Sequence, residues 1–306
     1  MSRILVIKLG ALGDFVQALG PMAAIRQHHA GDRITLLTTP PFKALAEASP
    51  YADEVWLDER PGLADPGGML RLRRKLRAAG FARVYDLQTS DRSSWYYRLM
   101  GPGKRPEWSG IARGASHPHA DPERDRLHTI DRQRDQLAAA GIPLVPPPDL
   151  GWAKAEIGHL GLAAPYAVLV PGASAHRPEK RWPADRFAEI ARRYAASGLQ
   201  PVVVGGPGEA GLGEAIRRHE EAALDLAGRT SLLELAQIGR GAVAALGNDT
   251  GPMHLLAAVG TPVTVLYSAA SDPLLTQPRG RSVHVLSRPH LADLTAGEVA
   301  ERLRLR

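Results

Sequence analysis

The sequence of 306 residues contains no cysteine, which excludes disulfides, thiolate metal sites and a cysteine nucleophile. This absence is typical of a protein from a reducing compartment. Aromatic residues make up only 5% of the chain, so leucine, valine and alanine must fill its cores. No apolar stretch approaches the ~20 residues that a membrane-spanning helix requires, and residues 1–7 lead directly into an expected strand rather than forming a signal peptide. We therefore expect a cytoplasmic protein, with the inner face of the cytoplasmic membrane as a second location.

Charge is unbalanced, because 38 lysines and arginines against 32 aspartates and glutamates give a formal net charge of +6. Five of the basic residues lie between Arg71 and Arg77, in a segment with helical character. The favoured interpretation is a solvated helix face. The alternative is a patch that contacts anionic lipid headgroups or an acidic acceptor. Nucleic acid is not an expected partner, because the sequence has neither a helix-turn-helix pattern nor a platform of basic and aromatic residues.

Strand-like and helix-like segments alternate through both halves of the chain, which predicts an α/β fold with parallel sheets covered on both faces. One long helix is expected at residues 15–28, and a loop rich in glycine, proline and histidine at 98–122. Expected strands lie at 4–7, 34–38, 55–57, 84–87, 166–170, 201–204, 242–246 and 263–267.

Three consecutive prolines at 146–148 are the strongest linker signal in the chain. They predict an amino-terminal domain of residues 1–148 and a carboxy-terminal domain of residues 149–306. The second domain ends in a helix expected at 295–305, which could pack back on the first domain. Two doubly wound domains that face each other leave a cleft at the carboxyl ends of their strands, where such sheets bind ligands.

The most informative segment is residues 247–254, Gly-Asn-Asp-Thr-Gly-Pro-Met-His, which lies after an apolar run and before a helical one. A helix that opens directly after a strand presents free backbone N–H groups to an anion. Asp249 and Thr250 are predicted to cap this helix, and Pro252 suits its first turn. His254 is expected one turn further on, within reach of a ligand. The segment therefore predicts a diphosphate pocket.

A second pattern, at residues 8–14, follows the first strand. Gly10 and Gly13 let the backbone turn tightly and approach a ligand, but the third glycine of a dinucleotide fingerprint is missing. Asp14 has two interpretations. It is either a carboxylate that accepts a backbone N–H at a helix start or a general base that faces the cleft.

A third pattern consists of two loops in the second half of the chain. Residues 172–174 offer backbone N–H groups and the Ser174 hydroxyl to a phosphate, and Lys180 offers a cation to a departing diphosphate. The alternative for this loop is an exposed basic segment. Glu209 follows a glycine-rich turn, where it could accept hydrogen bonds from ribose hydroxyls or simply begin a helix.

Together these motifs resemble the bacterial heptosyltransferases of glycosyltransferase family 9. The resemblance is carried by residues 4–14, by Lys-Arg-Trp-Pro at 180–183 and by Asn-Asp-Thr-Gly-Pro-Met-His at 248–254, with Gly-Thr-Pro at 260–262. It covers nearly the whole chain and is weakest at residues 62–108.

The resemblance implies the GT-B fold, in which two Rossmann-like, doubly wound parallel-sheet domains face a cleft. The acceptor would bind the first domain, near Gly10 and Gly13, and the nucleotide sugar the second. It implies inverting, metal-independent and cofactor-free transfer of heptose from ADP-heptose to the inner core of lipopolysaccharide. Asp14 corresponds to the family's proposed base, and Lys180 to the lysine near the phosphates. The donor-binding residues would be Ser174, Glu209, Asp249, Thr250, Gly251 and His254.

Other functions remain open at this point. The acceptor could be a protein or a capsule glycan, the donor could be another sugar nucleotide, and the chain could bind a nucleotide sugar without catalysis. A sugar-nucleotide epimerase would need further cleft carboxylates and histidines that the sequence does not reveal. A nicotinamide oxidoreductase is disfavoured by the missing third glycine.

Overall fold

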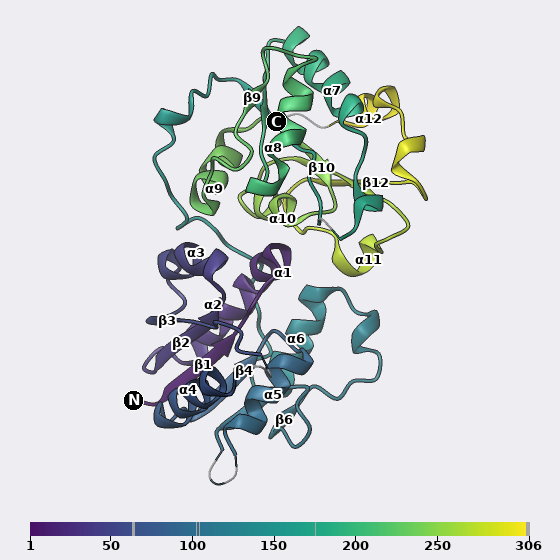
Figure 1. Ribbon diagram of the computed structural model, residues 1–306. Coiled ribbons are helices and arrows are strands. Elements are labelled where there is room, and N and C mark those ends of the chain that lie inside the picture. Colours follow the sequence, from purple (N-terminus) through teal and green to yellow (C-terminus); the bar gives the residue numbers. More distant parts are fainter. Residues whose placement is uncertain (63–64, 102, 104, 175, 304–306) are drawn as a thin grey trace. The chain divides into compact units, whose positions relative to one another are not determined.

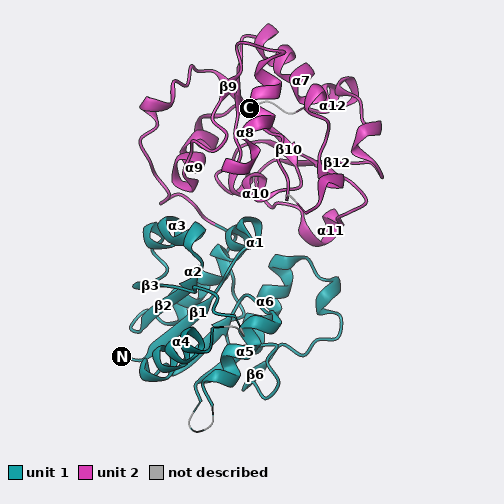
Figure 2. Cartoon of the chain, viewed as in Figure 1, with its two compact units in different colours: residues 1–148 teal, residues 149–306 magenta. Residues whose placement is uncertain are grey.

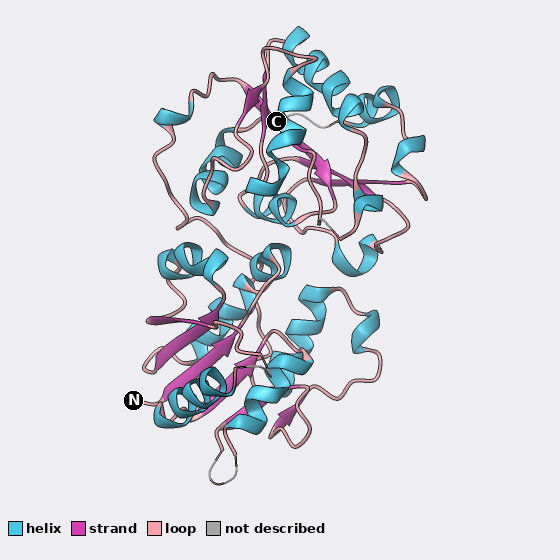
Figure 3. Ribbon diagram, in the orientation of Figure 1, coloured by secondary structure: helices cyan, strands magenta, loops and turns pink. Residues whose placement is uncertain are grey.

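The computed structural model describes residues 1–62, 65–101, 103, 105–174 and 176–303 (Figure 1). The chain divides into two compact units, Met1–Pro148 and Asp149–Arg306 (Figure 2). Each unit consists of one parallel sheet with helices packed against it (Figure 3). None of the described helices is long and apolar enough to cross a bilayer.

Unit 1 contains a six-stranded parallel sheet with the order β3-β2-β1-β4-β5-β6. Its strands are β1 (Arg3–Ile7), β2 (Arg33–Thr38), β3 (Glu54–Leu57), β4 (Arg83–Asp86), β5 (Glu107–Gly110) and β6 (His117–Pro118). Its helices are α1 (Leu12–Gln17), α2 (Leu19–His28), α3 (Lys43–Ala48), α4 (Pro66–Ala78), α5 (Asp91–Leu99) and α6 (Thr129–Ala139).

Side chains alternate between the two faces of this sheet, as the period of a strand requires. Leu5 and Ile7 join a buried cluster with Leu76 of α4 and Tyr96 of α5. The intervening residues of β1 are equally buried on the other side, and α1, α2 and α6 contact one another. Because both faces are covered, residues 4–7 of the central strand β1 are all apolar.

Unit 2 contains a second six-stranded parallel sheet, with the order β12-β11-β10-β7-β8-β9. Its strands are β7 (Tyr166–Val170), β8 (Gln200–Val203), β9 (Leu224–Asp225), β10 (Ala245–Asn248), β11 (Val263–Tyr267) and β12 (Val283–Ser287). Its helices are α7 (Ala184–Ala196), α8 (Ala210–Arg217), α9 (Leu232–Gly241), α10 (Gly251–Ala258), α11 (Pro273–Thr276) and α12 (Ala296–Arg302).

Two helical layers enclose this sheet. Helix α7 contacts both α8 and α12, and its Phe187 lies in one buried cluster with Leu246 and Leu266 of the sheet and Val299 of α12. Helices α9 and α10 contact each other. The tail helix is thus part of the unit 2 core, and the last positions of the predicted tail helix, 304–305, lie outside the described residues.

The strand order reverses at one point in each sheet, and that point positions the candidate site. In unit 1 the neighbours β1 and β4 lead to opposite halves of the sheet, and in unit 2 β7 and β10 do the same. Ligands of open α/β sheets bind beyond the carboxyl ends of the strands at such a point. Residues 8–14 follow β1, and Asn248 ends β10, so the motifs lie at these two reversals.

Three local predictions differ from the structure. The expected helix 15–28 is interrupted at Ala18, which separates α1 from α2. The expected loop 98–122 contains β5, which pairs with β4, and β6, which pairs with β5, although their sequences lack β-branched residues. The strand expected at 242–246 is displaced toward the motif, because β10 spans Ala245–Asn248.

Candidate active site

Asn248 joins β7 to β10 across the reversal point of unit 2. Its side chain is fully buried, and Nδ2 donates a hydrogen bond to the Pro171 carbonyl at 2.8 Å. Its Oδ1 accepts a hydrogen bond from the Trp182 backbone N–H at 3.0 Å. One neutral amide therefore fixes both the loop after β7 and the entry to α7. We did not predict this role, although Asn248 is the only asparagine in the sequence and closes an apolar strand.

Lys180 and Asp249 meet at the same end of the sheet. The Lys180 ammonium lies 2.6 Å from Asp249 Oδ2, and the two side chains are 15% and 10% exposed. Tyr267, at the end of β11, lies near this carboxylate. Burial raises the pKa of Tyr267, and the negative charge of Asp249 acts in the same direction. The arrangement holds a cation close to the surface where an anionic ligand can reach it.

Helix α10 begins directly behind this ion pair. Its N-cap is Thr250, which has extended backbone geometry but makes no side-chain cap hydrogen bond. Thr250 thus occupies the predicted cap position without a hydrogen bond from its hydroxyl, and the predicted cap from Asp249 is wrong, since Asp249 bonds to Lys180 instead. The prediction for Pro252 is confirmed, because it lies in the first turn after Gly251. His254 follows in the same turn and is only 8% exposed.

The two remaining donor-side predictions lie on neighbouring loops of unit 2. Glu209 Oε2 accepts a hydrogen bond from the Gly206 backbone N–H at 2.8 Å, so its local role is that of a helix-start carboxylate. Its carboxylate also lies against Gly172, where an added Cβ would overlap it. Ser174 is exposed, and its carbonyl accepts a hydrogen bond from the Arg177 N–H. Glycine at position 172 thus lets the loops after β7 and β8 approach each other.

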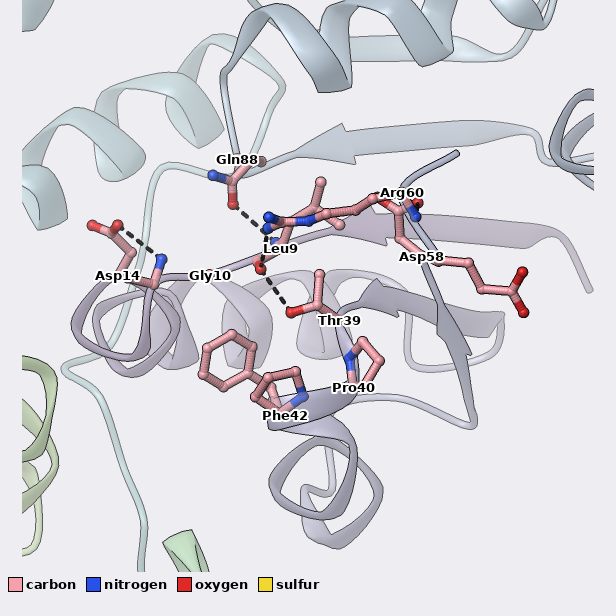
Figure 4. Close-up of a pocket in the computed structure, with 12 residues that line it drawn as sticks. Leu9, Gly10, Asp14, Thr39, Pro40, Phe42, Asp58, Arg60 and Gln88 are labelled. Carbon is pink, nitrogen blue, oxygen red and sulfur yellow. Dashed lines mark hydrogen bonds between the residues drawn. The ribbon is translucent and has the colours of Figure 1, made fainter. Parts of the chain in front are cut away.

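Of the predicted residues of unit 1, Gly10 and Asp14 line a pocket of about 620 Å³ at the carboxyl ends of its strands (Figure 4). Gly10 has a φ of +125°, and an added Cβ would lie 2.8 Å from the Phe42 ring, so only glycine fits there. Asp14 is the third residue of α1, and its Oδ2 accepts a hydrogen bond from the Ala11 N–H at 3.2 Å. Gly13 precedes it and is buried in the same helix.

Three contacts with the backbone of Leu9 shape the wall of this pocket. Its N–H donates to Gln88 Oε1 at 2.9 Å, and its carbonyl accepts from Thr39 Oγ1 at 2.9 Å. Arg60 reaches the same carbonyl at 3.4 Å from the turn after β3 (Figure 4). Strand ends β1, β2, β3 and β4 are thereby tied together around one backbone unit.

Buried Asp58 organises the β3 side of the pocket. Its side chain is fully buried and accepts hydrogen bonds from the Arg92 guanidinium, at 3.1 Å, and from the Tyr96 hydroxyl. It also accepts the Arg60 N–H at 2.8 Å, which holds Arg60 at a φ of +53°. Left-handed geometry is unfavourable for arginine. Asp58 therefore stabilises a strained turn that presents Arg60 to the pocket.

Lys8 and Asp86 form a second buried set of charges, on the β4 side. Lys8 Nζ donates to the Leu87 carbonyl at 3.1 Å. Burial lowers the pKa of Lys8, while the charges of Asp14 and Asp86 oppose that change. Burial raises the pKa of Asp86 to about 6, against the hydrogen bonds that it accepts and the charge of Lys8. Neither residue was predicted to have a role; Lys8 directly follows the apolar residues 4–7, and Asp86 is the last residue of β4.

The basic segment of α4 is divided between structural and exposed side chains. Arg73 donates to the carbonyls of Leu99 and Gly101, and the Lys75 ammonium lies 4.2 Å from the centre of the Trp56 ring. Arg71, Arg74, Lys75 and Arg77 are exposed. The solvated-face interpretation therefore fits most of this cluster, and Arg73 is its half-buried member.

No group of three or more potential metal ligands is clustered in the described parts of the chain. His117 and His119, two residues apart, have different partners. His117 lies 3.7 Å from Glu107, and His119 lies 2.7 Å from Asp135. The two histidines therefore lie beside two different carboxylates and do not converge on one site.

The structure places the predicted residues in two groups, one in each unit. Asp14, Gly10 and Gly13 lie at the β1 end of unit 1, while Lys180, Asp249, Thr250, Gly251 and His254 surround the β10 end of unit 2. Lys180 and Asp249, which are 69 residues apart in the sequence, are brought into direct contact. Glu209 and the backbone of Ser174 instead make hydrogen bonds within their own loops, to Gly206 and Arg177.

Comparisons with known proteins identify relatives over most of the chain. The sequence profile of glycosyltransferase family 9 (heptosyltransferase) matches residues 69–303. Lipopolysaccharide heptosyltransferase 1 of Pseudomonas aeruginosa is 26% identical, over 92% of this chain and 83% of its own length.

Solved structures match both units. The ADP-heptose lipopolysaccharide heptosyltransferase II of Escherichia coli superposes with a TM-score of 0.81 at 23% identity, covering 98% of this chain and 96% of that one. An E. coli heptosyltransferase solved with ADP gives a TM-score of 0.77 at 22% identity, covering 98% of each chain. The fold is therefore that of the GT-B heptosyltransferases, as the resemblance to glycosyltransferase family 9 implied.

Proposed function

Because the chain belongs to glycosyltransferase family 9, we propose that it transfers heptose from ADP-heptose to the inner core of lipopolysaccharide, with inversion and without a metal. In this proposal unit 2 binds the donor and unit 1 binds the acceptor. The observation that carries it is the placement of Lys180 beside Asp249 at the reversal point of the unit 2 sheet.

Donor binding rests on charge and backbone geometry. The diphosphate would lie at the start of α10, where the first-turn N–H groups and the helix dipole favour an anion. Lys180 would add a point charge to the phosphate oxygens. Ser174 and His254 would contact the phosphates, and Glu209 would accept the ribose hydroxyls. The relatives solved with ADP or named for ADP-heptose support this choice of nucleotide.

Acceptor activation is assigned to Asp14, which lines the unit 1 pocket beside Gly10. The acceptor hydroxyl would give its proton to the Asp14 carboxylate as its oxygen attacks the anomeric carbon of the heptose. A new C–O bond forms while the bond from that carbon to the diphosphate breaks on the opposite face, and the electron pair leaves with ADP. A single displacement of this kind inverts the anomeric configuration.

The leaving diphosphate would also be stabilised electrostatically. Negative charge develops on the diphosphate in the transition state, and a fixed cation with oriented N–H groups stabilises it without reorganisation. Lys180 would therefore serve both affinity and turnover. Gln88 and Arg60, which line the same pocket as Asp14, would orient the acceptor.

The direct test mixes the purified protein with ADP-heptose and a lipopolysaccharide acceptor truncated before its heptose. We expect release of ADP, a product heavier by one heptose, and an NMR coupling that shows inversion at the anomeric carbon. ADP binding without any transfer or hydrolysis would instead indicate a nucleotide-sugar-binding protein. Transfer only to a protein or a capsule glycan would overturn the assignment of the acceptor.

A further inference from the structure

We propose that the exposed side of α4 is a docking surface for the anionic phospholipid headgroups of a bilayer. This surface, which we call the basic face, consists of exposed side chains on α4 and on the loop before β5. They are Leu70, Arg71, Arg74, Arg77 and Arg105. The inference goes beyond the proposed reaction, and the binding that it predicts can be measured without any sugar transfer.

The net positive charge of the chain is concentrated in the segment that carries this face. Residues 66–106, from the start of α4 to the last residue before β5, contain ten lysines and arginines but only two aspartates, a net charge of +8. Because the whole chain carries +6, its remaining residues together carry −2. A local excess of one sign of charge creates a potential that attracts a surface of the opposite sign.

The charge pattern of α4 differs from that of an ordinary solvated helix. Helix α4 contains five lysines and arginines and no acidic residue, although like charges four positions apart destabilise a helix. Among the described residues, the one ion pair of an α4 cation joins Arg71 to the N-cap Asp65, at 3.9 Å. Helix α6 of the same unit carries both signs, and its Arg134 lies 3.2 Å from Asp131. An external anion therefore accounts for the cations of α4 better than solvation does.

Contacts within unit 1 join the cations of the two elements into one surface. Arg73 donates to the Gly101 carbonyl at 3.3 Å, which holds α4 against the end of α5 (Figure 1). Arg77 Nη2 lies 3.9 Å from the position that a Cβ at Gly103 would occupy. The Arg105 guanidinium lies against Gly101, where an added Cβ would overlap it. Arg77 and Arg105 thus approach the same short loop from its two sides.

Leu70 distinguishes a bilayer from a soluble polyanion as the partner. It is 43% exposed and precedes Arg74 and Arg77 by four and seven positions, so the three side chains share one side of the helix. An apolar side chain among cations suits the boundary between lipid headgroups and acyl chains. Nucleic acid is the weaker candidate, because α4 contains no aromatic residue on which a base could stack.

The position of α4 in unit 1 is compatible with a lipid-linked acceptor. Helix α4 follows the turn after β3, whose Arg60 lines the pocket. Since α4 connects strands of one parallel sheet, it runs back from their carboxyl ends toward their amino ends. Its first turns, with Leu70 and Arg71, therefore lie toward the pocket end of the sheet. With the acceptor proposed above, one bilayer would hold both the acceptor and the enzyme.

The experiment measures the partition of the full-length protein onto vesicles of phosphatidylcholine, with or without one-third phosphatidylglycerol, by co-sedimentation. The test variant is Arg74→Gln/Arg77→Gln. Its matched control is Arg192→Gln/Arg193→Gln, which removes two exposed arginines of α7 in unit 2 and changes the net charge equally. Leu70→Gln tests the apolar contact, with retention on a heparin column as the comparison. Urea unfolding verifies that every variant is folded.

We expect the wild type to bind vesicles that contain phosphatidylglycerol, more weakly as the salt concentration rises, and not to bind phosphatidylcholine alone. Each arginine near an anionic surface strengthens binding about fivefold, so the test variant should bind roughly twenty- to thirtyfold more weakly. The control should stay within about twofold of the wild type. The test variant should also be at least as stable to urea as the wild type, because it removes like charges from one helix.

Leu70→Gln should weaken vesicle binding roughly two- to fivefold and leave heparin retention unchanged. Unchanged vesicle binding in this variant would overturn the assignment to a bilayer. So would tighter binding of the wild type to duplex DNA than to phosphatidylglycerol vesicles at the same salt concentration.

The docking surface itself would be overturned if the test and control variants bound vesicles equally, or if the wild type did not bind phosphatidylglycerol vesicles. None of these measurements involves heptose transfer. A failure of the proposed function would therefore leave them unchanged, and their failure would leave the proposed function untouched.

Discussion

The two sheets differ in the kind of side chain that joins their strand ends at the reversal point. In each unit the strands diverge at one reversal point, and one side chain ties the two strand ends together there. In unit 2 that side chain is the neutral amide of Asn248, which bonds to the Pro171 carbonyl and the Trp182 N–H. In unit 1 it is the charged Lys8, which bonds to the Leu87 carbonyl and follows Ile7, the partner of buried Asp86 in the sheet.

The two units also differ in how deeply their charged side chains are buried. In unit 2 the buried Asn248 amide, which we call the neutral bridge, carries no charge. The ion pair of this unit, Lys180 with Asp249, lies closer to solvent. Unit 1 buries a cation and two aspartates, Asp58 and Asp86, beneath its pocket. A cation that is partly open to solvent suits the binding of an anion, whereas buried charges shift the pKa values of their neighbours, as at Asp86.

The two units differ in backbone strain as well. Among the described residues, the two non-glycine residues with positive φ, Arg60 and Thr89, both lie in unit 1. Each accepts this conformation with its N–H bonded to a buried aspartate, Asp58 or Asp86. Strain of this kind persists where the surrounding structure holds it, and it concentrates at functional sites.

The largest expected effect is on turnover. Asp14→Asn keeps the shape of the side chain but removes the base, so transfer should fall by roughly 10²- to 10⁴-fold. The measurement is kcat with ADP-heptose and the truncated acceptor. A matched control is Asp91→Asn, which changes an exposed aspartate at the start of another unit 1 helix and should leave kcat within twofold, roughly as for other surface changes. Wild-type kcat in Asp14→Asn would remove Asp14 from the mechanism.

The next effect is on stability and depends on pH. The folded protein favours protonated Asp86, because burial raises its pKa from an ordinary 3.8 to about 6. Stability that is present below pH 3.8 is therefore lost as the pH rises through about 6. Asp86→Asn should avoid this loss and be more stable than the wild type by up to about 3 kcal/mol at pH 8, with the gain vanishing near pH 4.

Urea unfolding of both proteins at the two pH values measures this difference. Asp58→Asn is the matched variant in the same unit, because Asp58 is buried but paired with Arg92 and Tyr96. It should lower stability at pH 8, where Asp86→Asn raises it. A pH-independent difference between Asp86→Asn and the wild type would contradict the origin that we assign to the effect.

Asn248→Ala tests the neutral bridge of unit 2. The substitution leaves the buried Trp182 N–H and Pro171 carbonyl without their partner, which should cost about 2 kcal/mol of unfolding free energy. Because no charge is involved, the loss measured by urea unfolding should be the same at pH 5 and pH 8. A loss that varies between these pH values would remove the contrast with unit 1.

Glu209→Ala should give the smallest effect. Loss of the hydrogen bond to the Gly206 N–H should cost about 1 kcal/mol of stability. If Glu209 also accepts the ribose hydroxyls, the Kd for ADP should rise roughly two- to tenfold. Calorimetry measures this against Glu214→Ala, an exposed glutamate of α8. Equal ADP affinity in both variants would leave Glu209 with a capping role only.

The fold class could be predicted because apolar strands and helices alternate clearly, and β7 and β11 begin and end where the pattern indicates. Strands β5 and β6 could not be predicted from the sequence. Glu107, Trp108, Ser109 and Gly110 form no apolar or alternating pattern, and their strand geometry depends on pairing with β4, which is remote in the sequence. Tertiary pairing decides such short edge segments.

The sequence motifs of the candidate site could be predicted, but the contacts between their side chains could not. The motifs identified Lys180 and Asp249 separately, but their contact depends on how the loop after β7 folds across β10. The same limit explains the wrong capping prediction, because a local rule cannot anticipate that a remote lysine binds the Asp249 carboxylate. Lys8 and Asp86 were missed because only the register of β1 with β4 brings them together.

The most direct test of the central claim, that the two units perform different tasks, is the Kd for ADP of four proteins measured side by side by calorimetry. The account predicts equal Kd values for the wild type, Asp14→Asn and the control Lys154→Met, which changes an exposed lysine of unit 2. It predicts a Kd roughly ten- to a hundredfold higher for Lys180→Met, which removes a charge-assisted contact to phosphate. Equal weakening by Asp14→Asn and Lys180→Met, or no weakening by Lys180→Met, would contradict it.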